Sequence, residues 1–412
     1  MKTLVIGSSG REHALALTLS RDPNVTEVHA APGNPGTAGV AELHDVDPLD
    51  GMAVADLAEK LGIDLVVIGP EAPLVAGVAD VVRERGIACF GPSREAARLE
   101  GSKAFAKAIM AAADVPTAMA HVCATPMEAA DALDAFGAPY VVKDDGLAAG
   151  KGVVVTDDRD VALAHAASCE RVVIEEFLDG PEVSVFAITD GTSVIPLRPA
   201  QDFKRLGDGD TGPNTGGMGA YTPLPWAPDG LVAEVTDRVL QPTIDEMTRR
   251  GTPFQGLLYA GLALTTRGVK VIEFNARFGD PETQALLCLL ESPLGALLYA
   301  AAQGRLDEMG PLKWRDGAAV AVVLAAKNYP DTPRKGDVIH GVDAAEALDQ
   351  VDVIQAGTAL DDEGRLVTAG GRVLAVTAVG TEVADARTKA YAGVAKIRID
   401  GSHHRSDIAA NI

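Results

Sequence analysis

Short hydrophobic runs alternate with helical patterns along the first hundred residues, and this alternation constrains the fold more than any other feature of the sequence. The expected strands are 4–6, 25–30, 65–68 and 87–90, and the expected helices are 11–20, 51–61 and 73–85. Strands that alternate with helices form parallel βαβ units with right-handed crossovers. The sequence therefore predicts an α/β protein whose first domain, residues 1–100, is built on a parallel sheet.

Three glycine-containing loops follow the expected strands of this first domain. They span residues 7–13, 31–37 and 69–73. In open parallel sheets the ligand crevice lies beyond the carboxyl ends of the strands. We therefore expect a small-molecule site along this edge.

The rest of the chain divides into a central region at 101–312 and a small C-terminal α/β domain at 313–412. The expected central elements are a hairpin at 140–156, strands at 172–177, 182–189, 257–265 and 269–274, and a helix at 230–250. The expected C-terminal elements are strands at 318–326, 351–355 and 371–379 and a helix at 382–397. A polar segment at 201–223 is too long for an ordinary turn, which is typical of a functional loop.

The charge balance limits the partners of this chain. Lys and Arg number 36 against 58 Asp and Glu, a net charge of −22 that repels nucleic acids and anionic membranes. A small anionic substrate would need lysines and arginines gathered at one place. The four cysteines show no paired spacing and the first residues form no secretion signal, so we expect a cytoplasmic protein, a monomer or alternatively a dimer.

The segment 140–153 places Lys143 and Lys151 around a loop of small residues between two expected strands. Backbone N–H groups in such a loop can approach phosphate oxygens, and lysine supplies a positive charge. The loop is no Walker A motif, because Gly152 follows Lys151 where Ser or Thr would stand. A plain hairpin with solvated lysines is the alternative.

The segment 271–282 carries three polar side chains on one face of an expected strand. Glu273, Asn275 and Arg277 alternate with Ile272, Phe274 and Ala276, which we expect on the opposite face. A carboxylate, an amide oxygen and a guanidinium in one row suit a metal–nucleotide site with a phosphate clamp. The alternative is an edge strand with a solvated polar face.

Two further segments carry weaker signals. Residues 172–184 form a hydrophobic strand that ends in acidic residues, which can accept hydrogen bonds from an amine and from ribose hydroxyls. In the second segment, Asp202, Lys204 and Arg205 precede a loop, 211–219, that is rich in backbone donors and suits phosphate or carboxylate. A charged turn and a disordered surface loop are the respective alternatives.

Assembled in order, these segments resemble the phosphoribosylamine–glycine ligases, also called glycinamide ribonucleotide synthetases, of the ATP-grasp superfamily. The resemblance covers essentially the whole chain and is carried by residues 7–14, 31–34, 69–74, 100–105, 146–152, 202–219 and 273–282. It implies a Rossmann-like N-terminal domain, an ATP-grasp region with a small lobe at about 115–185, and a C-terminal domain. It also implies that ATP phosphorylates glycine and that the amine of 5-phosphoribosylamine attacks the glycyl phosphate, giving glycinamide ribonucleotide, ADP and phosphate.

The resemblance also assigns roles to residues. For ATP it implies Lys103, Lys143, Gly150, Lys151 and Gly152 at the phosphates, Glu175, Glu176, Phe177 and Leu178 at the adenine, and Glu182 at the ribose. For Mg²⁺ or Mn²⁺ it implies Glu273 and Asn275, and for catalysis Arg277, Lys143 and Asp202. For the substrates it implies Gly10, Arg11, Gly69, Pro70, Glu71, Asp202, Lys204, Thr215, Gly216 and Gly217.

Three alternatives stay open from the sequence. One is a related ATP-grasp enzyme that uses bicarbonate or formate in place of glycine. Another is a nicotinamide-dependent dehydrogenase, although 7–10 does not match the glycine spacing of a dinucleotide-binding loop. The third is a nucleotide-binding module without catalytic activity.

Overall fold

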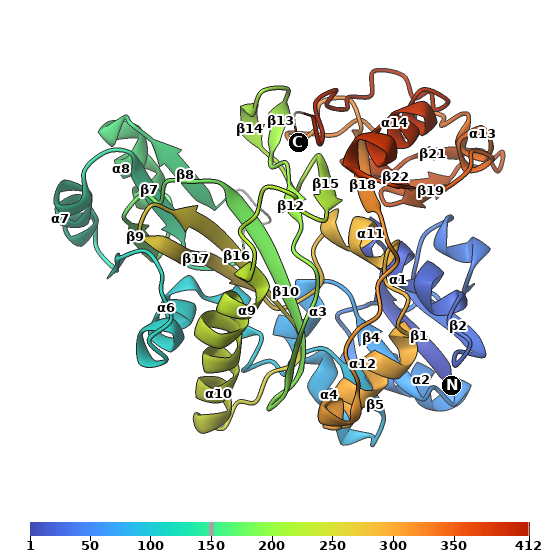
Figure 1. Cartoon of the computed structure of the whole chain (residues 1–412), viewed down its shortest axis with the longest axis horizontal. Coiled ribbons are helices and arrows are strands. Elements are labelled where there is room, and N and C mark those ends of the chain that lie inside the picture. The colour runs from blue at the N-terminus through green and yellow to red at the C-terminus, as the bar shows by residue number, and fades with distance from the viewer. Residues whose placement is uncertain (148–151, 411) are drawn as a thin grey trace.

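A parallel sheet forms the N-terminal part of the computed structural model, which describes residues 1–147, 152–410 and 412 (Figure 1). The strand order is β3-β2-β1-β4-β5. The strands are β1 (Lys2–Gly7), β2 (Glu27–Pro32), β3 (Glu42–Leu43), β4 (Leu65–Ile68) and β5 (Ala88–Phe90). The helices are α1 (Gly10–Ser20), α2 (Gly51–Leu61), α3 (Glu71–Ala76) and α4 (Val78–Glu84), with a short 3-10 turn η1 (Thr37–Gly39).

The parallel sheet predicted for this domain is confirmed, with one difference in its helices. The single helix expected at 73–85 is two helices, because Gly77 between them has a φ of +88° that ends α3. Buried side chains of β1 and β4 pack on both faces of the sheet, against α2 and α4 on one face and against α1 and α12 on the other.

The central region contains two antiparallel sheets (Figure 1). The small lobe has the order β6-β9-β7-β8. Its elements are β6 (Ala120–Cys123), α7 (Pro126–Phe136), β7 (Tyr140–Asp144), β8 (Val153–Thr156), α8 (Arg159–Ala167) and β9 (Val172–Glu175). The helices α5 (Arg98–Gly101) and α6 (Lys103–Ala112) lead into this lobe, which has its own small hydrophobic core.

The second central sheet has the order β11-β10-β16-β17. Its strands are β10 (Glu182–Asp190), β11 (Val194–Pro196), β16 (Gln255–Thr265) and β17 (Gly268–Asn275). The helix expected at 230–250 is one run made of α9 (Leu231–Val235), the π-helical η2 (Thr236–Leu240) and α10 (Gln241–Arg249). After β17 come α11 (Glu282–Leu287), α12 (Leu294–Ala302) and the 3-10 turn η3 (Leu306–Glu308).

The polar segment 201–223, expected to be a loop, forms short strands instead. They are β12 (Gln201–Asp202), β13 (Arg205–Gly207), β14 (Thr211–Asn214) and β15 (Gly219–Thr222). β15 is buried along its whole length, and β13 and β14 form a separate two-stranded ribbon. The few buried side chains around Tyr221 are enough to bring this polar segment into a sheet, which the composition of the segment does not indicate.

That sheet is the C-terminal one, with the order β12-β15-β18-β22-β19. Its later elements are β18 (Ala318–Ala325), α13 (Val342–Glu346), β19 (Val351–Gln355), β22 (Arg372–Gly380) and α14 (Val383–Val394), with a hairpin of β20 (Thr358–Leu360) and β21 (Leu366–Thr368). Strands β12 and β15 thus tie the central region to the C-terminal sheet, while the boundaries at 312 and 313 stay predictions. Among the described residues, no helix has both the length and the hydrophobicity that a membrane crossing requires.

Candidate active site

Strand β17 presents the predicted polar row. Glu273, Asn275 and Arg277 are half-buried, whereas Phe274 and Ala276 between them are buried. The predicted alternation fails only at Ile272, because a register shift against Gly261 and Leu262 of β16 leaves this residue without a partner. The bulge breaks the alternation one residue before Glu273 and leaves the polar row itself intact.

Four cations surround the carboxylate of Glu273. They come from four separate segments of the chain and are Lys103 on α6, Lys143 on β7, Lys204 after β12 and Arg277 after β17. Burial by itself opposes ionisation of Glu273, but these four charges lower its pKa below the ordinary value. Within the described part of the chain, this carboxylate accepts no hydrogen bond and forms no ion pair. An ionised carboxylate among cations can hold a hard metal ion.

A second carboxylate, that of Glu175 at the end of β9, is fully engaged. Its two oxygens lie 2.9 Å from Nζ of Lys143 and 3.0 Å from Nζ of Lys107. The Lys143 ammonium also donates to the backbone oxygen of Ile272 at 3.0 Å, which links the small lobe to β17. The sequence predictions missed Lys107, although its spacing of four residues from Lys103 places both on one face of α6.

The segment predicted to bind adenine, 175–178, begins with Glu175 and continues with a second, partly buried carboxylate, that of Glu176. The carboxylate of Glu176 binds Lys270 at 2.8 Å and Arg267 at 3.0 Å. Burial would raise the pKa of Glu176, but these partners and the amide of Met119 lower it to about 2. Since both acidic side chains are engaged, the backbone groups of this segment, the exposed ring of Phe177 and the partly exposed Leu178 remain to contact a nucleotide.

Asp202, Lys204 and Glu182 form a charged group beside Glu273. Lys204 donates to Glu182 at 2.6 Å, and attraction to Asp202, Glu182 and Glu273 raises the pKa of Lys204 although burial alone would lower it. Burial raises the pKa of Asp202 to about 7, with Glu282 and Glu182 adding to the effect and Lys204 opposing it. Asp202 can therefore gain or lose a proton near neutral pH.

Arg277 turns toward the N-terminal domain. Its Nη2 lies 3.2 Å from Glu100 and its Nε 3.4 Å from Glu71, and the attraction raises the pKa of Arg277 despite burial. Glu100 also accepts a hydrogen bond of 2.7 Å from the amide of Ala276, which fixes the backbone next to Arg277. Glu100, which was not among the predicted site residues, therefore positions Arg277.

The start of α1 meets the end of the β17 segment. The amide of Arg11 donates to Asp280 at 3.2 Å, and its guanidinium donates to the oxygen of Phe278 at 3.1 Å. Arg372, from the C-terminal sheet, donates to the backbone oxygens of Asp280 at 2.6 Å and Gly216 at 2.7 Å. Three domains therefore converge here, and no sequence signal pointed to Arg372.

Two of the predicted glycines stand where a side chain would not fit. A Cβ at Gly69 would lie 2.1 Å from Oε1 of Glu12, and a Cβ at Gly10 would lie 2.7 Å from the amide nitrogen of Gln284. Glu12 binds the guanidinium of Arg11 at 2.5 Å. The loops at 7–13 and 69–73 thus lie against each other, as the parallel sheet predicts.

The remaining predicted residues lie in two places, the turn at 215–217 and the loop at 146–152. Thr215 accepts from the amide of Gly217 and donates to the oxygen of Lys204, so this turn lies beside the charged group. Gly152 is described and its oxygen accepts from the amide of Asp144 at 2.7 Å. Gly150 and Lys151 lie outside the described residues. Lys103 donates to the oxygen of Gly146 at 2.9 Å, at the near end of the same loop.

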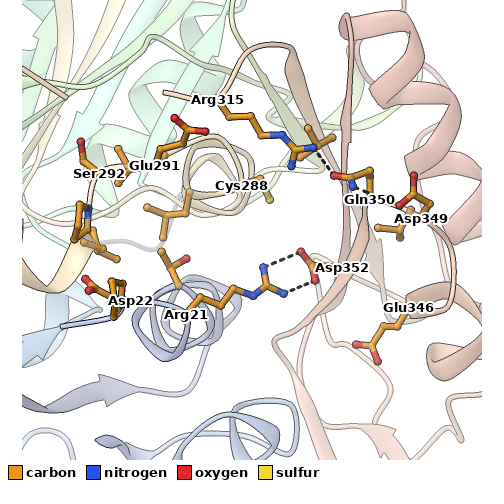
Figure 2. A pocket seen from close by; sticks show the side chains of 18 of the residues that line it. Arg21, Asp22, Cys288, Glu291, Ser292, Arg315, Glu346, Asp349, Gln350 and Asp352 are labelled. Atoms are coloured by element: carbon orange, nitrogen blue, oxygen red, sulfur yellow. Dashed lines mark hydrogen bonds and ion pairs between the residues drawn. The ribbon is translucent and has the colours of Figure 1, made fainter. Parts of the chain in front are cut away.

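A cavity of about 600 Å³ lies away from these groups, between α1, the segment after α11, and β19 (Figure 2). Arg21 reaches across it to Asp352 at 2.9 Å, and Arg315 donates to Gln350 at 2.7 Å. Of the described residues, those that line this cavity include none of the predicted site residues. The candidate active site is therefore identified by the cations that gather around Glu273, and not by this cavity.

Comparison with known families matches three successive parts of the chain. Family models described as the N domain, the ATP-grasp (A) domain and the C domain of phosphoribosylglycinamide synthetase match residues 1–100, 101–283 and 319–411. The chain belongs to the phosphoribosylglycinamide synthetase family. The predicted family, the ligase class and the α/β architecture are thereby confirmed.

Named members of the phosphoribosylglycinamide synthetase family are similar over their whole length. A phosphoribosylamine–glycine ligase of Streptomyces coelicolor is 66% identical over 412 residues, which is 100% of this chain and 99% of that protein. One from Mycobacterium tuberculosis is 58% identical over 417 residues, covering 99% and 97%. A crystal structure of the Thermotoga maritima phosphoribosylamine–glycine ligase superposes with a TM-score of 0.86 at 35% identity, covering 99% and 100%.

Proposed function

We propose that this protein joins glycine to 5-phosphoribosylamine with ATP, giving glycinamide ribonucleotide, ADP and phosphate, as the names of its relatives indicate. One observation carries the proposal: Lys103, Lys143, Lys204 and Arg277 meet around Glu273 in a chain whose net charge is −22. A local cluster of cations against an acidic background attracts a polyanion such as triphosphate.

The same place fits a divalent cation. Glu273 offers an ionised carboxylate and Asn275 an amide oxygen, the hard donors that Mg²⁺ and Mn²⁺ prefer. Bound there, the ion would neutralise charge on the transferred phosphoryl group. Arg277 extends this face of β17 and would contact the same group, while Glu100 and Glu71 hold its guanidinium in place.

The nucleotide would lie between the small lobe and β17. Lys143, held by Glu175, and Lys103, which donates to the oxygen of Gly146, would contact the phosphates. The backbone of 176–178 would contact adenine, because the side chains of Glu175 and Glu176 already have partners. Glu182 would bind the ribose and exchange its contact with Lys204 for a hydroxyl.

The acceptor would lie on the N-terminal side of Arg277, near Gly10, Arg11, Gly69, Pro70, Glu71 and the turn at 215–217. ATP first phosphorylates the glycine carboxylate and leaves as ADP. The amine then forms the new C–N bond, phosphate leaves, and the amine loses a proton. Asp202, whose pKa is about 7, is suited to accept that proton.

Repulsion is the main barrier that the site must overcome, since both the glycine carboxylate and ATP are anions. Fixed cations offset that repulsion without reorganising during the reaction. Holding the reactants in register contributes further, up to roughly 7–11 kcal/mol in favourable cases. We place this activity in the cytoplasm and assign it to a monomer, which size-exclusion chromatography with light scattering would check.

The test measures ADP release by the purified full-length protein. We expect release to require glycine and phosphoribosylamine together and to stop when either is omitted. Replacing glycine with bicarbonate or formate distinguishes a related ATP-grasp ligase, because release with either acid would contradict the proposal. ATP binding without any release under all conditions would indicate a nucleotide-binding module.

A further inference from the structure

Two histidines and a glutamate meet at the edge of the N-terminal sheet, and none of the three is among the residues assigned to the ligase reaction. Nδ1 of His29 lies 3.0 Å from Nε2 of His44. The carboxylate of Glu42 lies 3.8 Å from the first nitrogen and 3.9 Å from the second. All three potential ligand atoms are within 4.8 Å of one another.

The parallel register brings these residues together. His29 on β2 is paired with Glu42 on the edge strand β3, and the amide of His44 donates to the oxygen of Ala30. Paired residues of neighbouring strands point to the same face, and so do residues two apart on one strand. The three side chains therefore lie on one face because of backbone pairing, which makes the cluster a fixed feature of the sheet edge.

A second carboxylate, that of Glu27, orients the imidazole of His29 through the ring nitrogen that faces away from His44. Its Nε2 lies 3.4 Å from a carboxylate oxygen of Glu27, which Lys2 holds at 3.0 Å. An Nε2–H that donates to Glu27 leaves a lone pair on Nδ1, directed at His44 and Glu42. A carboxylate behind a histidine in this way is the usual support of a metal-binding imidazole.

We propose that His29, Glu42 and His44 form a binding site for a divalent transition-metal ion, of which Zn²⁺ is the natural probe. Two imidazoles and one carboxylate suit such ions and leave a position for water. Zn–N bonds of about 2.0–2.1 Å in a tetrahedral site separate two ligand nitrogens by about 3.3 Å. The observed 3.0 Å is close to that separation, and the exposed Glu42 is free to approach.

Charged side chains also lie around the cluster, and one of them is Lys60 of α2. The other charged groups facing the cluster are Glu27 and Lys2. A bound ion would fasten the two-residue strand β3 to β2, and with it the loop whose Asn34 contacts Ser8 and Gln355.

The test uses the untagged full-length protein, stripped with a chelator and titrated with Zn²⁺ in the absence of ATP. We expect one equivalent to bind to this site, to raise the melting temperature, and to give a tetrahedral visible spectrum with Co²⁺. The variants H44Q and E42Q should lose this equivalent, and E27Q should weaken it about 10–100-fold. E42Q changes an exposed side chain and so tests the site even if H44Q folds poorly.

Two controls separate this site from other binding. H404Q removes an exposed histidine of the C-terminal region, and E273A removes the proposed catalytic ligand; both should retain the equivalent. Absence of Zn²⁺ binding by the unsubstituted protein, or equal binding by E42Q and H44Q, would overturn the proposal. In that case the His29–His44 contact is a hydrogen bond that holds β3 in place.

Discussion

The ammonium group of Lys143 lies 2.9 Å from the carboxylate of Glu175, in a pair that is almost completely buried. The second oxygen of Glu175 holds Lys107 at 3.0 Å, so one carboxylate pairs with two lysines and leaves one positive charge uncompensated within the triad. Lys143 thereby stays extended toward Ile272 of β17. The pair fixes Lys143, the lysine that we propose binds phosphate, between the small lobe and β17, the strand that carries the proposed metal ligands.

Removing this carboxylate should destabilise the fold. E175A leaves Lys143 and Lys107 buried without their shared partner, and breaking a buried ion pair costs about 3–5 kcal/mol. We expect a reduction of this size in the free energy of unfolding, measured in urea. The control is E363A, which removes an exposed carboxylate paired with Arg365 and should change stability by less than about 1 kcal/mol. Equal effects of the two substitutions would contradict the structural role given to Glu175.

Removing the carboxylate of Glu273 should abolish turnover while leaving the fold intact. E273A and the isosteric E273Q take away the proposed metal ligand, and neither leaves an unpaired partner behind among the described residues. We expect melting temperatures close to that of the unsubstituted protein and a loss of metal-dependent ADP release. Near-normal activity at saturating Mg²⁺ would show that the metal is held elsewhere.

Asp202 should make stability depend on pH. Its pKa is raised to about 7 in the folded protein, above that of an unfolded aspartate near 3.9. The folded state therefore retains this proton between about pH 4 and 7, and the contribution of Asp202 to stability falls as pH rises through that range. Relative to D202N, the unsubstituted protein should lose free energy of unfolding from pH 4 to 7 and then level off. Parallel pH profiles for the two proteins would contradict the assigned pKa.

A methyl group at position 69 should damage the acceptor side of the site. In G69A the new Cβ would lie 2.1 Å from Glu12, which must move and release Arg11. We expect a higher KM for phosphoribosylamine with a smaller change in the KM for ATP. The control is G39A, which adds a methyl group to open space and should leave both KM values unchanged. G62A is unsuitable as a control, because Gly62 has a φ of +65° and a side chain there would strain the backbone. A selective rise in the KM for ATP would place Gly69 on the wrong side of the site.

Local sequence patterns predicted many helices and strands well, because the formation of these elements depends on residues that are close together along the chain. The helix expected at 51–61 and the strands expected at 65–68 and 351–355 have the observed bounds. The polar row of β17 follows from simple alternation, as does the hairpin that carries Lys143. The strands at 201–222 were missed because they are short, and because β12 and β15 are stabilised by a sheet that is completed only by the later strands β18, β22 and β19.

The sequence patterns could not predict the contacts between domains. Arg372 reaches Asp280 and Gly216 only because three domains fold against one another, and nothing near Arg372 along the chain indicates this. The engagement of Glu175 by two lysines likewise depends on how β9, β7 and α6 pack. Lys107 is different, since its spacing from Lys103 on one helix face was a usable signal.

The most direct test of the cation cluster is a crystal structure of this protein with Mg²⁺ and the non-hydrolysable ATP analogue AMPPNP. We predict the triphosphate between Lys143 and Arg277, with the ion at Glu273 and Asn275. A triphosphate bound in the cavity beside Arg21 and Arg315, or anywhere away from Glu273, would contradict the account.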